Sequence, residues 1–266
     1  MSDRYLRVGA HVPGTVEHAW VVRHDAPTTE VLVPDGRGLL QVVVGPAGTL
    51  RDVLTGVERP DGTGLRGLTT HAALRRHGDA VVRVGVQLHP LATTRLGRGP
   101  LADVWQPAET LVGADVLAAV ATDVAVGEDE RAARRLVDAL AVVPRVEGDD
   151  LGRLADALRV VDEREGRVSA GELARAVEAT VSDLYRWSER FLGVELGRYL
   201  AAIRFTVLVR EAVGRGTHDV GQVAGVLRWY VRAGHPPREV ERLTGLAPAE
   251  LRRVLDRLTD VVAPVR

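Results

Sequence analysis

Hydrophobic and polar positions follow two different patterns along this chain. In the first hundred residues, short apolar runs such as EVLVPD, GLLQVVVG and VVRVGVQLH are separated by Gly, Pro and Asp. Runs of this length bounded by turn-forming residues predict short β-strands. The same stretch holds half of the chain's 28 glycines. We therefore expect residues 1–110 to form a β-rich barrel or sandwich.

Helical periodicity replaces this pattern after residue 110. The segment 111–150 is acidic, and its apolar residues form two stripes at helical spacing: Leu117, Val120 and Val124, then Leu136, Leu140 and Val143. Packing against the β-rich domain or pairing with a second copy of the chain would each explain these stripes. We place a domain boundary in VPRVEGDD, which ends at Asp150. The fold class is then α+β, with an all-α C-terminal domain over residues 151–266.

Two successive capping signals define a helix-turn-helix pattern within this C-terminal domain. Ser169 is followed three residues later by Glu172, and Thr180 is followed in the same way by Asp183. Each pair can satisfy free backbone amides in the first turn of a helix. Apolar residues at helical spacing follow each cap: Leu173, Ala174 and Val177 in the first helix, and Leu184, Trp187 and Phe191 in the second.

The second of these helices has an outer face that suits the major groove of DNA. That face carries Ser182, Tyr185, Arg186 and Glu189. These side chains offer donors, acceptors and a planar guanidinium for base edges. Arg190 lies beside them and is placed for a phosphate contact. Capped amphipathic helices with charged outer faces also occur in helical proteins that do not bind DNA.

The stretch VSAGELARAVEATVSDLYRWSERFLGVELGRYLAAIRF resembles the first helix-turn-helix of AraC/XylS-type transcription regulators. The residues that recur in that family fall here on Leu184, Arg186, Gly193, Tyr199 and Arg204. A weaker resemblance to the second helix-turn-helix follows in DVGQVAGVLRWYVRAGHPPREVERLTGLAPAELRR. The resemblance implies a first unit at 165–205 and a second unit at 217–258. It further implies that a connecting helix lets both units enter successive major grooves of double-stranded DNA.

The N-terminal part also resembles a domain found ahead of such DNA-binding domains, in PGTVEHAWVVRHD, VLVPDGRGLLQVVVG and VGVQLHPLA. In such regulators an N-terminal barrel, often cupin-like, binds a small-molecule effector or mediates dimerisation. The resemblance thus implies a homodimer with a sensor domain. For the second unit it implies weaker DNA contacts by Arg232, His235 and Arg238.

The sequence departs from the family pattern at both turns. Glu178 and Arg228 stand where glycine is usual, and a non-glycine residue at positive φ costs on the order of 1 kcal/mol. Pro236 and Pro237 occupy what should be the first turn of the second recognition helix, where only its start tolerates proline.

Three arrangements of the second unit remain open. Its recognition helix begins at Pro237 and exposes Arg238 and Arg242, or the unit no longer grips DNA in the usual way. Alternatively, PPREVERLTG and APAELRRVLDRL form a helix-turn-helix of their own. In that case the contact residues are Arg252, Arg253 and Arg257.

Charge supports DNA binding only weakly. The chain of 266 residues has a net charge of −1, and all 35 basic side chains are arginine. Residues 151–266 hold 19 arginines against 16 acidic residues, so the helical domain is only slightly basic. A strongly basic domain would fit phosphate neutralisation better. The guanidinium fork still suits guanine edges and phosphates.

Composition argues against an enzyme. The chain has no cysteine and no lysine, which removes thiol nucleophiles, Schiff bases and the lysine of a phosphate-binding loop. His18 and His24 lie too far apart along one strand to share a metal ion. We therefore expect no catalytic residue, metal or cofactor. Trp20 is the one proposed ligand contact, because an aromatic ring inside a barrel can stack on a planar molecule, although a core role is the more common one.

These observations lead to one hypothesis and one alternative. We expect a sequence-specific DNA-binding transcription regulator, cytoplasmic because no apolar run is long enough to cross a membrane and no signal-peptide core is present. The alternative is a module with a degenerate regulator fold that binds a ligand or a protein but not DNA. The departures at the turns favour this alternative, and the intact first unit favours the regulator.

Overall fold

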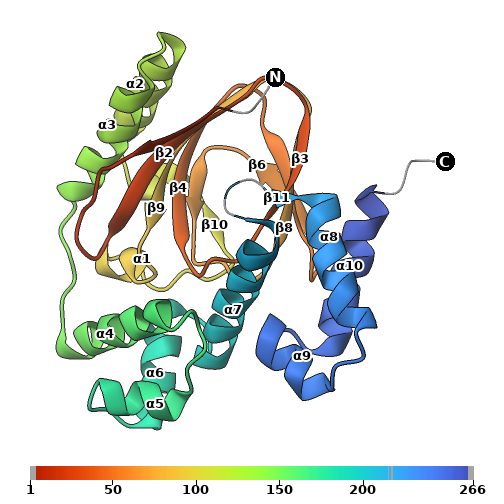
Figure 1. Ribbon diagram of the computed structural model, residues 1–266. Helices are drawn as coiled ribbons and strands as arrows, with labels where there is room; N and C mark the ends of the chain where they lie inside the picture. The colour runs from red at the N-terminus through yellow and green to blue at the C-terminus, as the bar shows by residue number, and fades with distance from the viewer. Residues whose placement is uncertain (1–3, 215, 217, 263–266) are drawn as a thin grey trace.

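The computed structural model describes residues 4–214, 216 and 218–262 (Figure 1). The outer ends of the two predicted domains and residue 217, the predicted start of the second unit, lie outside the described residues. The strands are β1 (Arg4–Val8), β2 (Val16–His24), β3 (Thr28–Leu32), β4 (Gly38–Val44), β5 (Gly48–Asp52), β6 (Glu58–Asp61), β7 (Gly64–Arg66), β8 (Ala73–His77), β9 (Val81–Leu88), β10 (Trp105–Gln106) and β11 (His218–Asp219). The helices are α1 (Ala92–Arg95), η1 (Ala108–Thr110), α2 (Ala114–Ala125), α3 (Asp129–Ala141), α4 (Asp149–Glu163), α5 (Ala170–Ala176), α6 (Val181–Leu192), α7 (Leu196–Val213), α8 (Val220–Arg232), α9 (Pro237–Thr244) and α10 (Pro248–Val262).

Two antiparallel sheets make up the N-terminal part. Sheet A has the strand order β1-β2-β9-β4-β7-β10, and sheet B has the order β11-β3-β8-β5-β6. The two sheets do not join into one closed barrel. Of the two predicted architectures, barrel and sandwich, the structure therefore has the sandwich. The predicted α+β fold class is confirmed, because the described chain after residue 110 is almost entirely helical.

One face of sheet A is apolar and is covered by α2 and α3. Ala19 and Val21 of β2 pair with Val86 and Val84 of β9, and all four side chains are buried in the same core. The two predicted helical stripes supply the other side of this core. Figure 1 shows α2 and α3 lying along this face of the sheet. Packing against the sheet therefore accounts for the stripes.

A polar network connects the two sheets. Asp61 of sheet B is completely buried and lies 3.2 Å from the guanidinium of Arg83 in sheet A and 2.8 Å from that of Arg75 in sheet B. Gln41 donates to the same carboxylate at 3.0 Å, and Arg75 is also paired with Glu30 at 3.2 Å. Charges buried in this way are tolerated only when they are paired and hydrogen-bonded.

The helical part is divided between two cores. Residues of α4 to α7 form one of them, with Leu68 and Leu91 as additions from the N-terminal part. The helices α8 and α10 pack on each other and share the other core with sheet B, in which Val31 and Leu74 lie. The strand β11, just before α8, also pairs with β3. The second unit is therefore joined to the β-sandwich by backbone hydrogen bonds and by a common core.

Candidate nucleic-acid interface

Both predicted capping boxes of the first unit are present. The Ser169 hydroxyl accepts from the Glu172 amide at 3.2 Å, and the Glu172 carboxylate accepts from the Ser169 amide at 2.8 Å. At the start of α6, Thr180 and Asp183 make the same reciprocal pair at 3.1 and 3.2 Å. The donors of Thr180 hold the pKa of Asp183 below its usual range, and those of Ser169 do the same for Glu172.

The buried face of α6 agrees with the predicted stripe. Leu184 and Trp187 are buried in the core of α4 to α7, and Phe191 is half-buried against it. Leu192 and Gly193 end the helix, with Gly193 in the left-handed conformation at φ 73°. This packing fixes which face of α6 points outward.

The outer face of α6 brings together the five side chains predicted to contact DNA. Ser182, Tyr185, Arg186, Glu189 and Arg190 are all exposed. The guanidinium of Arg186 lies 2.6 Å from an Asp183 carboxylate oxygen, with 63% of its side chain exposed. The guanidinium of Arg190 lies 5.0 Å from the ring centroid of Phe191. A guanidinium so exposed is free to exchange its carboxylate partner for a guanine edge or a phosphate.

The turn between α5 and α6 has the expected strained residue. Glu178, which stands where the family has glycine, adopts φ 51°. Left-handed backbone costs an L-residue about 1–2 kcal/mol. The turn therefore keeps its left-handed conformation although Glu178 makes it less stable than glycine would. The backbone carbonyl of Glu178 accepts from the Arg153 side chain of α4 at 3.4 Å.

The helix α7 connects the first unit to the second and is fixed to the β-sandwich. Tyr199 is fully buried, and its hydroxyl accepts from the Arg37 guanidinium at 3.4 Å. Arg37 also pairs with Glu17 and with Asp162 of α4, both at 2.7 Å. Burial raises the pKa of Tyr199, so the phenol stays protonated. The connecting helix and the β-sandwich thus meet through a specific, partly buried network.

The second unit differs from the family pattern in its turn. Arg228 lies inside α8, which continues to Arg232, so the expectation that Arg228 occupies the turn is wrong. The chain reverses instead between Ala233 and Pro236, and Pro236 is the N-cap of a helix that begins at Pro237. Proline is compatible with this first position because its missing amide would have no partner there. The first of the open arrangements, a helix starting at Pro237 with Arg238 and Arg242 exposed, is present in the structure.

The three residues predicted from the second unit lie close together at the junction of α8 and α9. Arg232 and Arg238 are exposed. His235, which lies between them in the sequence, is half-buried. The His235 ring packs 5.6 Å from the Trp229 ring, centroid to centroid, and its Nδ1 lies 3.8 Å from a Glu239 carboxylate oxygen. Figure 1 shows α9 at the same end of the molecule as α6, far from α2 and α3.

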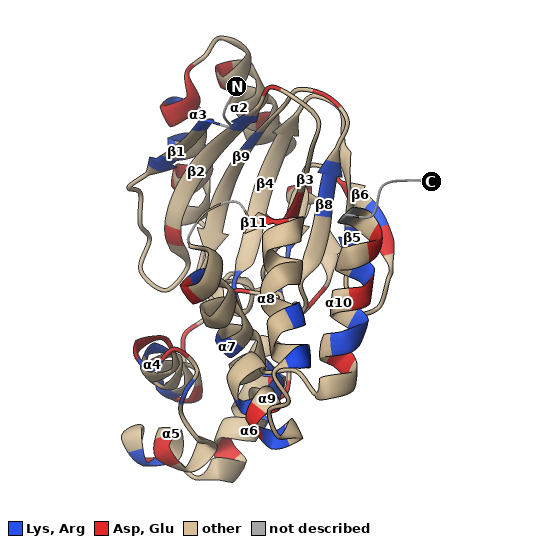
Figure 2. Ribbon diagram, turned by 45° about the vertical axis from the view of Figure 1, so that its right-hand side comes forward, with Lys and Arg blue, Asp and Glu red and all other residues tan. Residues whose placement is uncertain are grey.

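The helix α10 follows α9 after a short turn at Gly245, as in the third arrangement. Arg252 and Arg253 are exposed on α10, where Figure 2 shows basic and acidic residues alternating along the helix. Arg257 has a different role, because its guanidinium donates to the backbone carbonyl of Val53 at 2.6 Å. It therefore attaches α10 to sheet B and is not available for DNA in this arrangement.

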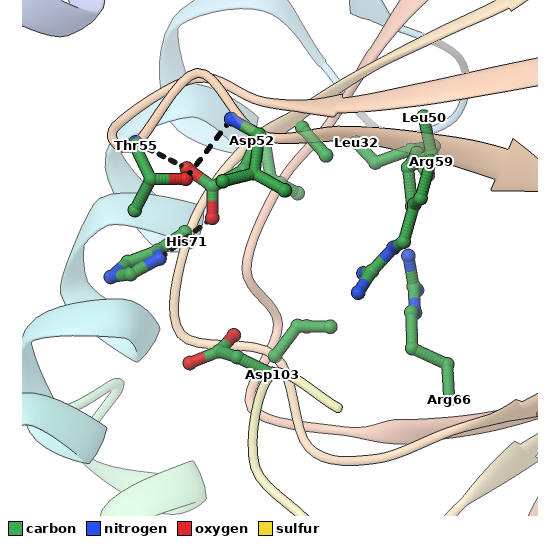
Figure 3. A pocket seen from close by; sticks show the side chains of 12 residues that line it. Leu32, Leu50, Asp52, Thr55, Arg59, Arg66, His71 and Asp103 are labelled. Carbon is green, nitrogen blue, oxygen red and sulfur yellow. Dashed lines mark hydrogen bonds and ion pairs between the residues drawn. The ribbon is translucent and has the colours of Figure 1, made fainter. Parts of the chain in front are cut away.

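Trp20 lies apart from the cavity of the β-sandwich. The ring is 8% exposed and lies over Gly85 of the neighbouring strand, where an added Cβ would come within 2.2 Å of it. The cavity is lined by other residues, among which Arg59, Arg66 and His71 stand out (Figure 3). None of these three residues was expected at a ligand site, although an arginine between apolar residues in GLRGL was an available signal.

Within the described residues, no three His, Cys, Asp or Glu residues come close enough together to hold a metal ion. No helix within the described ranges has the length and apolar character that a membrane span requires.

Comparison with solved structures finds similar chains. The crystal structure of ToxT from Vibrio cholerae O395 is 16% identical, covers 91% of this chain and 97% of its own, and gives a TM-score of 0.43. ToxT bound to (E)-4-(8-methylnaphthalen-1-yl)but-3-enoic acid is 13% identical over 96% and 100% of the two chains, with a TM-score of 0.41. CuxR, an AraC-like transcriptional activator, is 15% identical over 73% and 77%, with a TM-score of 0.32.

This chain is similar to an AraC-like regulator. Regulators of this class are also the ones that the sequence resembles. No protein-family model matches the chain, and a comparison with curated proteins finds no match either. At such low identity and TM-score, the roles of individual residues have to be argued from this chain's own geometry.

Proposed function

We propose that this protein is a transcription regulator that binds double-stranded DNA in a sequence-specific manner. The observation that carries the proposal is the exposed face of α6, a doubly capped helix whose position is fixed by its own buried face. A short helix presented in this way after a tight turn is the geometry that enters a major groove. The α6 face combines hydroxyl, phenol, guanidinium and carboxylate groups, which together can distinguish base pairs.

Each side chain of this face has a proposed role. Ser182, Tyr185 and Arg186 contact base edges, and Arg186 is the main determinant because its fork can donate twice to a guanine. Glu189 lies on the same face and can accept from cytosine. Arg190, nearer the end of the helix, contacts a phosphate.

The second unit contributes more weakly in this proposal. Arg238 lies in the first turn of α9, and Arg232 and His235 lie beside it. Because α9 lies at the same end of the molecule as α6, both helices can face one duplex (Figure 1). We further propose that the β-sandwich senses a small-molecule effector and that the protein acts as a homodimer, so that two copies read a two-fold symmetric site.

One feature favours the alternative of a binding module that does not recognise DNA. The second unit is attached to sheet B by β11, by a shared core and by Arg257, which restricts how far it can adjust to a duplex. If this attachment dominates, α6 alone would give only weak and nonspecific binding.

Fluorescence anisotropy with the purified protein tests the proposal. The labelled duplex is the region upstream of the protein's own coding sequence, measured against unlabelled competitor DNA and across a range of salt concentrations. Saturable binding that resists competitor and weakens steeply with salt is the expected result. If genomic fragments selected with the protein also bind no better than random DNA, the alternative module is correct.

A further inference from the structure

A cavity of about 240 Å³ opens in the β-sandwich beside sheet B. Leu32, Leu50 and Val57 give it an apolar wall, and Arg59 and Arg66 supply positive charge. Figure 3 shows the two guanidinium groups turned toward each other on one side of the cavity, with Asp103 and His71 on the opposite side. The cavity therefore has a cationic end, a polar end and an apolar wall between them.

The cationic end has no acidic partner of its own. Among the described residues, neither Arg59 nor Arg66 is within ion-pair or hydrogen-bond distance of a carboxylate, and the Nε of Arg66 is buried without any hydrogen-bond partner. Arg59 instead lies over the ring of Trp105, 5.7 Å from its centroid. Burial and the nearby Arg75 lower the pKa of Arg66 to about 10, and Arg59 lowers it too, whereas the carboxylates of Asp35 and Asp61, which lie beyond ion-pair distance, act in the opposite direction. Two cations that face each other without a hydrogen-bonded carboxylate repel, and an anion between them would reduce that cost.

We propose that this cavity binds a small organic carboxylate, with its charged end between Arg59 and Arg66 and its apolar body against Leu32 and Leu50. The guanidinium groups can each donate two parallel hydrogen bonds to a carboxylate. A volume of about 240 Å³ is at the low end for ligand sites, which favours a compact molecule.

The polar end of the same cavity holds the connecting helix α7. Arg198 of α7 donates to the Thr70 hydroxyl at 3.0 Å, and Thr70 donates to the Asp103 carboxylate at 2.5 Å. Arg198 also contacts the Nε2 of His71, whose Nδ1 lies 2.9 Å from the Asp52 carboxylate. Because arginine can only donate, Nε2 must accept, and Nδ1 carries the proton that is donated to Asp52.

This arrangement links the cavity to the position of the helical units. Asp52, His71 and Asp103 all line the cavity, and together they hold Arg198, which lies on the connecting helix α7. A bound carboxylate would change the packing and the electrostatic field at these three side chains. The effect on DNA affinity rests on the proposed function, whereas the binding of the carboxylate does not.

Isothermal titration calorimetry of the full chain without DNA tests the binding site. The probes are benzoate, butyrate and inorganic phosphate, with benzamide as a neutral molecule of nearly the same shape as benzoate. We expect saturable binding of benzoate or butyrate at least about tenfold tighter than of benzamide, because only the anions engage the guanidinium pair. Arg66→Met and Arg59→Met should each weaken binding about tenfold or more, and Arg76→Met, which removes an exposed arginine of β8, should not.

Thermal unfolding without ligand separates binding from folding in these variants. Replacing a half-buried cation that has no ion-pair partner by an apolar side chain should leave the Tm of Arg66→Met unchanged or raise it. Equal affinity for benzoate and benzamide would overturn the proposal, as would carboxylate binding that both arginine variants retain. Binding of phosphate alone, or of no probe, would also overturn it.

The link to DNA is tested with the duplex selected under the proposed function. Saturating carboxylate should change the Kd for that duplex by about fivefold or more, and by linkage the DNA should change carboxylate affinity by the same factor. Arg198→Met should keep carboxylate binding and lose this effect. An unchanged Kd in the wild type would contradict the link, and the calorimetry would still decide the ligand site if the protein bound no DNA.

Discussion

The two helical units of this protein are alike in sequence pattern but differ in the contacts that fix them in place. The first unit lies in a core made mainly by α4 to α7, and its α6 face is open to solvent. The second unit shares its core with sheet B, continues that sheet through β11 and is fastened by Arg257. The first unit thus presents a surface to solvent, and the second is fixed to the β-sandwich.

The difference extends to the turns. The first unit holds a glutamate, Glu178, at φ 51°, whereas the turn after α9 has Gly245 at φ 74°. At Gly245 an added Cβ would come within 2.2 Å of the Ala201 carbonyl oxygen of α7. Only glycine allows this close approach, so α9 is positioned by contact with the connecting helix. The first turn is positioned mainly by its capping residues.

The largest expected effect is on the separate core of the first unit. Trp187 is 2% exposed, and Trp187→Ala should lower the free energy of unfolding by about 3–5 kcal/mol. Hydrogen exchange should increase in α4 to α6 and remain slow in sheets A and B. Leu227→Ala, in the core shared with sheet B, should instead loosen both α8 and β3. Equal loss of protection in all regions for Trp187→Ala would show that the two cores are not independent.

The close approach at Gly245 gives the next largest effect. Gly245→Ala introduces both left-handed strain and a clash with backbone, which together should cost about 2–4 kcal/mol of stability in a thermal unfolding measurement. Gly234→Ala, in the turn before α9, is the matched control. It has a similar φ of 71° but no atom within 4 Å of the added Cβ, so only the strain should remain. If the two variants unfold at the same temperature, α9 is not held by contact with α7.

The exposed face of α6 should account for most of the sequence preference. Arg186→Ala should weaken binding to the selected duplex by about 1–3 kcal/mol and leave nonspecific binding almost unchanged. Arg238→Ala in the second unit should have a smaller effect, less than about tenfold. Arg134→Ala, which removes an exposed arginine of α3, serves as the control. If Arg186→Ala weakens specific and nonspecific binding equally, the side chain contacts phosphate and not a base.

The strained turn of the first unit gives the smallest effect. Glu178→Gly should relieve about 1–2 kcal/mol of backbone strain. Glycine also makes the unfolded chain more flexible, which costs about 0.4–1 kcal/mol, so the net gain in stability should be about 0.5–1 kcal/mol. The measurement is again thermal unfolding. Glu178→Ala removes the same side chain but keeps the strain, so it should give no gain. A gain of equal size in both variants would mean that the Glu178 carboxylate, and not the backbone conformation, lowers the stability of the turn.

Local features of the fold could be predicted from the sequence because they depend on neighbouring residues. The capping boxes at Ser169 and Thr180 and the buried stripe of α6 need only a few residues of sequence, and the structure has them. The positive φ at Glu178 could also be expected, because glycine is usual at this position in the family that the sequence resembles. The apolar stripes of α2 and α3 predicted a buried face, although not which surface covers it.

Features that join distant segments could not be predicted in this way. The strand β11 has two residues and takes its conformation from β3 rather than from its own sequence. Arg257 looked like any exposed arginine of an amphipathic helix, and only the position of Val53 shows its role. The cavity depends on residues from β3, β5, β6, β7 and β8, so Arg59 and Arg66 become a pair only after the sheets are assembled.

The central claim, that the α6 face reads base sequence, is tested most directly by selecting binding sites from a random pool of duplexes with the wild-type protein and with Arg186→Ala. The account predicts that the wild type enriches a motif containing a guanine at a fixed position and that Arg186→Ala loses the preference at that position alone. Enrichment of no motif by the wild type, or of the same motif by both proteins, would contradict it.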